Sequence, residues 1–160
     1  MICSASCAER SPSLATSFRR RCSWKSGAIW RDSARHAYRP WLTSDPARLS
    51  PKARKAIAQA RKDAASLAIS DITLLELATL ARKGRIQLTI SVESLLQEIE
   101  ARFVVLPISS RSCARTLLLP TSYPRDPADR LIGATALVEG LSLVTADREI
   151  RQSKALATIW

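Results

Sequence analysis

The stretch that decides the fold runs from Asp126 to Asp147 and reads DPADRLIGATALVEGLSLVTAD. Asp126 followed by Pro127 is typical of a helix start, because the aspartate oxygen accepts backbone N–H groups and proline needs no N–H in the first turn. Gly140 is typical of the residue that ends a helix in the left-handed conformation. The apolar, β-branched run 141–145 then predicts a short buried strand. We therefore expect a helix that packs against the strand following it.

The same alternation of helix and short apolar strand extends upstream to Leu42. Helices are expected where capping residues bound a periodic run, over residues 51–63, 72–83, 92–101 and 109–118. Extended segments are expected where the run is short and apolar, over residues 66–69, 86–89, 103–106 and 157–160. Wholly apolar strands between helices are typical of a parallel sheet covered on both faces. The predicted fold class is α/β, an α/β/α sandwich with a short central parallel sheet.

Residues 1–41 differ from the rest of the 160-residue chain. They hold eight of the 25 Lys and Arg, two of the 14 acids, and three of the four cysteines and of the four tryptophans, with no apolar period. We expect an irregular basic leader, disordered or non-native, followed by one domain over residues 42–160. A net charge of +11 favours a polyanionic partner, but more than half of the excess lies in this leader and is weak evidence for one.

The composition also excludes several classes of protein. No stretch approaches the roughly 20 apolar residues of a membrane span, and Glu9 and Arg10 interrupt the place of a signal-peptide centre. His36 is the single histidine, which excludes a Ser-His-Asp hydrolase, and the cysteines lack zinc-site spacing. Four glycines leave no Gly-rich phosphate loop. We expect a cytoplasmic protein without a membrane partner.

Three carboxylates lie at sequence positions where α/β proteins carry catalytic or ligand-binding residues. Glu76 lies among leucines, where an ionised carboxylate needs a cation or hydrogen bonds. Asp129 lies in the first turn of its helix, where the apolar face begins. Asp147 follows the strand 141–145, at the edge where α/β sheets bind ligands.

Each carboxylate also has a purely structural interpretation. Glu76 fits the solvent face of its helix, and Asp147 fits an ordinary turn. Asp126, three residues before Asp129, fits an N-cap. Taken together, one Glu and two or three Asp at one sheet edge are the hard oxygen ligands that Mg²⁺ or Mn²⁺ prefers. The sequence therefore predicts a divalent metal site that activates water against a phosphodiester.

Five motifs in a fixed order make the chain resemble the PIN-domain ribonuclease toxins of the VapC type. They are LTSDPARLS at 42–50, IS at 69–70 leading to LEL at 75–77, RKGRI at 82–86, DPADRLIGATA at 126–136 and LVTAD at 143–147.

By this resemblance Glu76, Asp129 and Asp147 correspond to the second, third and fourth acidic residues of the family, with Asp126 beside them. The resemblance implies Mg²⁺-dependent (or Mn²⁺-dependent) cleavage of RNA. It also implies a homodimer that a cognate antitoxin protein inhibits.

One part of the family pattern is missing. The family opens with a strand ending in Asp-Thr-His, whose aspartate is the first metal ligand, and nothing in residues 1–41 reads as that strand. Permitted codons for residues 30–41, read one base out of frame, can encode Gly-Val-Ile-Leu-Leu-Asp-Thr-His. We therefore hypothesise a frame-shifted or misassigned leader and expect the first strand to be missing or corrupted. Loss of one ligand lowers ion affinity, so we expect weak or no nuclease activity.

A second interpretation belongs to another functional class. The chain can be a non-catalytic relic that binds RNA or an antitoxin through Arg54, Lys55, Arg61 and Lys62. A solvated helix face explains the same basic run.

Overall fold

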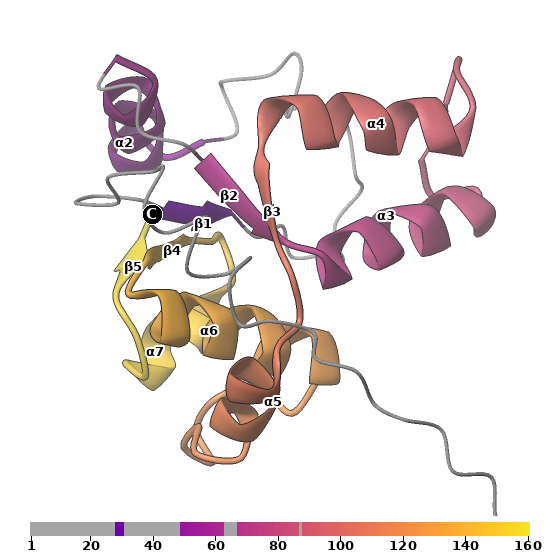
Figure 1. Ribbon diagram of the computed structural model, residues 1–160. Helices are drawn as coiled ribbons and strands as arrows, with labels where there is room; N and C mark the ends of the chain where they lie inside the picture. Colours follow the sequence, from indigo (N-terminus) through magenta and orange to yellow (C-terminus); the bar gives the residue numbers. More distant parts are fainter. Residues whose placement is uncertain (1–27, 31–48, 63–66, 87) are drawn as a thin grey trace, which may run out of the picture.

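The computed structural model describes residues 28–30, 49–62, 67–86 and 88–160, and within them the chain forms one sheet with helices on both faces (Figure 1). The sheet has five short strands in the order β3-β2-β1-β4-β5, and every neighbouring pair is parallel. The strands are β1 (Ala28–Trp30), β2 (Leu67–Ser70), β3 (Val104–Leu106), β4 (Ser142–Val144) and β5 (Thr158–Ile159). The predicted α/β fold with a central parallel sheet is confirmed.

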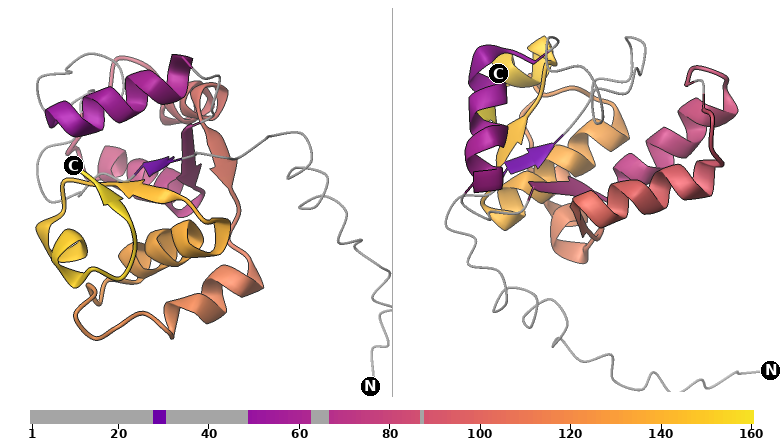
Figure 2. Two further views of the ribbon diagram at one scale, coloured as in Figure 1. Left: turned by 90° about the vertical axis from the view of Figure 1, so that its left-hand side faces the viewer. Right: turned by 90° about the horizontal axis from the view of Figure 1, so that it is seen from above.

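The described helices divide between the two faces of the sheet. They are α2 (Pro51–Lys62), α3 (Ile72–Arg82), α4 (Val92–Arg102), α5 (Ser110–Thr116), α6 (Pro127–Glu139) and α7 (Arg148–Ser153). Side chains of α2, α3 and α4 form one apolar cluster with the sheet, and side chains of α6, α7 and the loop after α5 form the other. Figure 2 shows α3 and α4 side by side, reaching outward from the sheet.

Strand β2 shows how the sheet separates these two clusters. Leu67 and Ile69 belong to the cluster with α2, α3 and α4, whereas Ala68 between them packs with α6. Successive side chains of a strand point to opposite faces, which explains the division. Because both faces are covered, the strand is apolar throughout instead of alternating with polar residues.

The prediction that residues 1–41 contribute no strand is wrong. Strand β1 lies at the centre of the sheet, with Ala28 opposite both Leu67 of β2 and Ser142 of β4. Three residues are too short to display a period of two in the sequence, and this strand is stabilised by backbone pairing with two partners distant along the chain. The predictions about the rest of the leader fall on residues 1–27 and 31–41, which lie outside the described residues.

Local capping chemistry explains most of the observed helix ends. Ser91 and Ser109 accept the backbone N–H groups of Ser94 and Ser112 at the starts of α4 and α5. Gly140 adopts φ +67° and ends α6 as expected, since a left-handed residue is favourable for glycine. Residues 86–89 were expected to be extended, but they form no strand in the part of this segment that is described.

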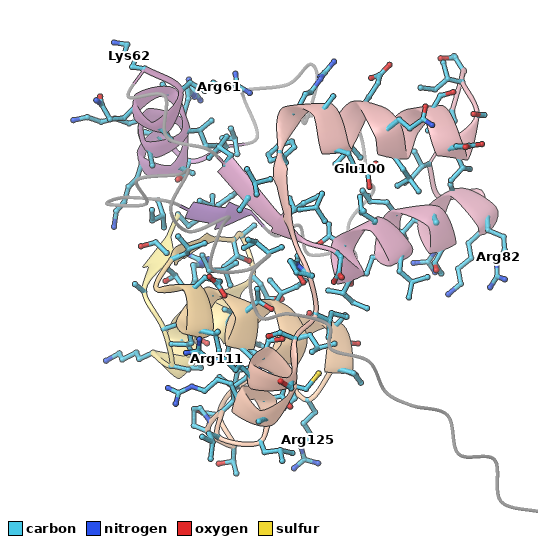
Figure 3. The ribbon with its side chains drawn as sticks, in the orientation of Figure 1. Arg61, Lys62, Arg82, Glu100, Arg111 and Arg125 are labelled. Atoms are coloured by element: carbon cyan, nitrogen blue, oxygen red, sulfur yellow. The ribbon has the colours of Figure 1, made fainter. Side chains whose placement is uncertain are left out.

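The exposed basic side chains are spread over several helices. Figure 3 shows Arg61 and Lys62 at one end of α2, Arg82 at the end of α3, and Arg111 and Arg125 around α5. Of the helices that the structure describes, none combines the length and the apolar character needed to cross a membrane.

Candidate metal centre

The order of the strands defines where a ligand can bind. Within the sheet, β2 and β3 lie on one flank of β1, and β4 and β5 lie on its other flank. The strand order therefore reverses between β1 and β4, and α/β sheets bind ligands at the carboxyl ends of the strands beside such a reversal. Asp147 lies three residues beyond the end of β4, at this edge.

Helix α6 presents Asp129 at the same edge. The helix is joined through Gly140 to the start of β4, so its first turn lies near the carboxyl ends of the strands. Asp126 caps it by accepting the N–H groups of Ala128 and Asp129 at 2.9 and 3.2 Å, and Pro127 follows. The structural interpretation of Asp126 as an N-cap is confirmed.

Asp129 is held in a rigid setting. Only 6% of the residue is exposed, and the buried Tyr123 donates a hydrogen bond from its hydroxyl to the Asp129 carbonyl oxygen at 3.1 Å. A Cβ on Gly133 would clash with the hydroxyl of Tyr123, so α6 needs glycine there. The Arg130 side chain donates to the carbonyl oxygens of Thr116 and Leu119 at 2.7 and 3.2 Å and fixes the loop before α6.

Glu76 lies in the second turn of α3, on the border between the packed and the exposed sides of that helix. Its neighbour Leu77 is buried, whereas Leu75 is exposed. Glu76 itself is half-buried and takes part in an interaction within the protein. It therefore lies neither in the core nor on the open solvent face that the structural interpretation required.

Asp147 serves as a helix cap in this structure. Its Oδ1 accepts the N–H groups of Glu149 and Ile150 at 2.8 and 3.1 Å and starts α7, a helix that the sequence interpretation missed. The Asp147 N–H donates to Oγ1 of the buried Thr145 at 3.1 Å, which fixes the turn after β4. One oxygen of the Asp147 carboxylate thus has a structural role as a helix cap.

The topology predicts that Glu76, Asp129 and Asp147 share one edge, but among the described residues their side chains form no finished site. Among the residues that the structure describes, no three His, Cys, Asp or Glu side chains come close enough together to hold a metal ion. The residues that follow β1 along the chain lie outside the described residues. The three carboxylates still fit Mg²⁺ or Mn²⁺ by donor type, since both ions prefer hard oxygen ligands.

Three further oxygens beside this edge escaped the sequence interpretation. Among the residues that the structure describes, Ser70 Oγ, Asp71 Oδ1 and Thr73 Oγ1 are buried and have no hydrogen-bond partner. Asp71 occupies the N-cap position of α3 without capping it, and its Oδ2 accepts the Ile108 N–H at 3.0 Å. The regular spacing of Ser70, Thr73 and Glu76, three residues apart, is the signal that could have drawn attention to this turn.

Comparison with known proteins identifies the family of the chain. Residues 28–156 match the PIN domain family, starting at the first residue of β1 and inside the range expected to be a leader. Ribonuclease VapC22 of Mycobacterium tuberculosis is 42% identical over 122 residues, which cover 75% of this chain and 91% of that protein.

Two solved structures show the same fold at low sequence identity. One is VapBC2 from Rickettsia felis bound to a promoter DNA fragment, with a TM-score of 0.61 and 19% identity over 82% of this chain and 96% of that one. The other is FitAcB from Neisseria gonorrhoeae, with a TM-score of 0.51 and 22% identity over 82% and 95% of the two chains. The chain therefore belongs to the PIN-domain family and, within it, to the VapC type.

Proposed function

We propose that this protein is a metal-dependent endoribonuclease, the toxin of a toxin-antitoxin pair, in which Glu76, Asp129 and Asp147 hold Mg²⁺ or Mn²⁺. The proposal is supported by the strand order, in which Asp147 follows β4 beside the reversal, in a chain 42% identical to a named ribonuclease. When bound, the ion would lower the pKa of a water molecule and stabilise the charge of a phosphodiester.

The residues around the acids would give the site its rigidity. Tyr123 and Arg130 fix the first turn of α6, so the Asp129 carboxylate starts from a defined backbone position. The cap at α7 likewise fixes the backbone of Asp147, whose Oδ2 would then be the oxygen that binds the ion. A site assembled from fixed elements loses little conformational entropy when it binds an ion or a substrate.

We further propose that activity is weak because the first acid of the family is lost. The family motif Asp-Thr-His does not follow β1, where the sequence reads Arg31-Asp32-Ser33. Fewer carboxylate ligands mean a lower affinity for a hard divalent cation. This part of the proposal concerns residues outside those that the structure describes.

The partners follow from the same proposal. A toxin of the VapC type would be inhibited by a cognate antitoxin, would act in the cytoplasm on RNA, and would work as a homodimer. Exposed leucines support self-association, since Leu117 and Leu118 after α5 are 84% and 71% exposed. Adjacent large apolar side chains in water favour burial against another protein surface.

Cleavage of RNA by the purified full chain tests the proposed activity. Mg²⁺ should support slow cleavage that EDTA abolishes. Asp129→Asn should lower the cleavage rate by roughly 100-fold or more, because loss of a residue that only supports a metal ligand already lowers activity by up to about that factor. The matched control is Asp126→Asn, which changes an exposed cap of the same helix and should leave the rate unchanged. Equal rates for Asp129→Asn and the unmodified chain would overturn the proposal.

A second candidate is the non-catalytic binding protein that uses α2. Two observations favour it: the absence of a three-ligand group in the described part of the chain, and a helix whose exposed cations include Arg54, Lys55, Arg61 and Lys62 without an acid. Thermal unfolding with added Mn²⁺ separates the candidates. A metal enzyme is stabilised by its ion, whereas a relic that binds no ion is not.

A further inference from the structure

The turn between β2 and α3 carries hydroxyl groups that the fold does not use. Ser70 is 0% and Thr73 is 9% exposed, and within the described part of the chain neither Oγ of Ser70 nor Oγ1 of Thr73 has a hydrogen-bond partner. Burying an unpaired hydroxyl is unfavourable, so buried polar groups normally find partners. Two such groups within one turn therefore call for a specific explanation.

Helix capping does not supply that explanation. Ser50, Ser91 and Ser109 precede helices and each accepts a backbone N–H from the first turn. Ser70 and Thr73 flank the start of α3 and make no such bond, and the N-cap Asp71 is engaged with the Ile108 N–H. The hydroxyls are thus available for a task other than starting the helix.

Their positions relate them to two of the proposed metal ligands. Ala68 of β2 packs in the cluster with α6, so the alternation of a strand places Ser70 on the same face, the one covered by the helix of Asp129. Thr73 precedes Glu76 by three residues in α3, a spacing that puts two side chains on one helix face.

We propose that Ser70 and Thr73 are positioning residues for the divalent ion. In the ion-bound protein the Ser70 hydroxyl donates a hydrogen bond to the Asp129 carboxylate, and the Thr73 hydroxyl donates one to the Glu76 carboxylate. Ligand carboxylates are commonly oriented by such outer hydrogen bonds, which raise metal affinity. The inference rests on the metal clause of the proposed function.

This role has a signature that a structural role lacks. A hydroxyl with no partner in the metal-free protein can be deleted without loss of stability. The same deletion weakens ion binding if the hydroxyl orients a ligand. A hydroxyl that binds a structural water would instead stabilise the fold with or without metal.

Thermal unfolding of the full chain tests the inference, with EDTA or with increasing Mn²⁺. We expect Ser70→Ala and Thr73→Val to melt within about 2 °C of the unmodified chain in EDTA. We expect the Mn²⁺ concentration for half-maximal stabilisation to rise about 10- to 100-fold in both. Thr73→Ser retains the hydroxyl and should restore the original Mn²⁺ concentration.

The chain offers matched controls with partnered hydroxyls. Ser112 Oγ donates to the Ser109 carbonyl oxygen at 2.9 Å, and Thr135 Oγ1 donates to the Leu131 carbonyl oxygen at 2.8 Å; both residues are buried. Ser112→Ala and Thr135→Val should show an unchanged midpoint in Mn²⁺, and Ser112→Ala should also lower the melting temperature in EDTA.

The outcomes separate this inference from the proposed function. If Mn²⁺ does not stabilise the unmodified chain, the metal clause of the proposed function fails, and this inference fails with it. If Mn²⁺ stabilises the unmodified chain and Ser70→Ala and Thr73→Val equally, the positioning role alone is wrong. A drop in melting temperature of the same size in EDTA and in Mn²⁺ also overturns it, since that result identifies a structural hydroxyl.

Discussion

The hydroxyl of Tyr123 donates a hydrogen bond to the backbone carbonyl oxygen of Asp129 at 3.1 Å, in the interior of the protein. The same hydroxyl lies against Gly133, one turn further along α6, where no Cβ could be accommodated. The side chain of Tyr123 therefore packs the loop 117–125 against the first two turns of α6. This contact lies on the backbone of a proposed metal ligand and connects the stability of the fold to the site.

Tyr123→Phe and Gly133→Ala should therefore be coupled. Tyr123→Phe removes one buried hydrogen bond and should cost about 1 kcal/mol of unfolding free energy. Gly133→Ala forces a methyl group against the ring and should cost about 1–3 kcal/mol. The double variant should lose less than the sum, because removing the hydroxyl opens space for the methyl group. Urea unfolding measures all three values, and strict additivity would show that the two residues do not press on each other.

Asp147→Asn and Asp126→Asn form a matched pair. Both aspartates cap helices, and asparagine caps nearly as well, so each substitution should change the unfolding free energy by about 1 kcal/mol or less. Only Asp147 is a proposed metal ligand. RNA cleavage should therefore fall with Asp147→Asn and stay constant with Asp126→Asn. Equal cleavage by the two variants would show that Asp147 is a cap and nothing more.

Leu117 and Leu118 give a prediction about assembly. Replacing both with serine should shift the protein from dimer towards monomer, because burial of two apolar side chains would no longer stabilise the interface. Light scattering after size-exclusion chromatography measures the mass. The control is Ile90→Ser, which changes an exposed apolar residue in the loop before α4. An unchanged dimer in the leucine variant would place the interface elsewhere, and a monomeric unmodified chain would contradict the dimer itself.

Elements with local signals could be predicted from the sequence. Asp126 caps the helix expected of it, and Gly140 ends α6 as expected; Ser91 and Ser109 cap the helices predicted to begin beside them. These features depend on residues within one turn of each other, so the chemistry of the residue types is sufficient. The parallel sheet could be predicted from the sequence because its strands after the first are short, apolar and separated by helices.

Elements that depend on distant partners could not be predicted. Strand β1 has three residues and is defined by pairing with β2 and β4, whose first paired residues are Leu67 and Ser142. Helix α7 has six residues, and its cap Asp147 looks like a turn residue when read alone. Contacts such as the one between Asp71 and Ile108, 37 residues apart, leave no periodic trace in the sequence.

The same division applies to the site. The order of elements leads us to expect Glu76, Asp129 and Asp147 at one edge, where helices and loops that follow parallel strands begin, and this remains a prediction. How each carboxylate is used depends on side-chain packing. Asp147 uses one carboxylate oxygen to cap α7, and Asp129 is buried beside Tyr123. Neither detail follows from spacing along the chain.

Because β1 ends two residues before Asp32, substitution of Asp32 tests whether this acid supplies the first metal ligand. In the sequence Asp32 follows the end of β1 by two residues, but the next residues are Ser33 and Ala34 where the family has Thr-His. If the first ligand is lost, as we propose, Asp32→Asn should change RNA cleavage and the Mn²⁺ midpoint by less than about twofold, because an acid outside the site contributes little at the ion. The VapC22 relative, assayed in parallel, should cleave faster than this chain. A large loss of cleavage in Asp32→Asn would show that Asp32 supplies the first ligand and that the site is complete. That result would also remove the need for a frame-shifted leader, since the encoded frame would already carry the acid after the central strand.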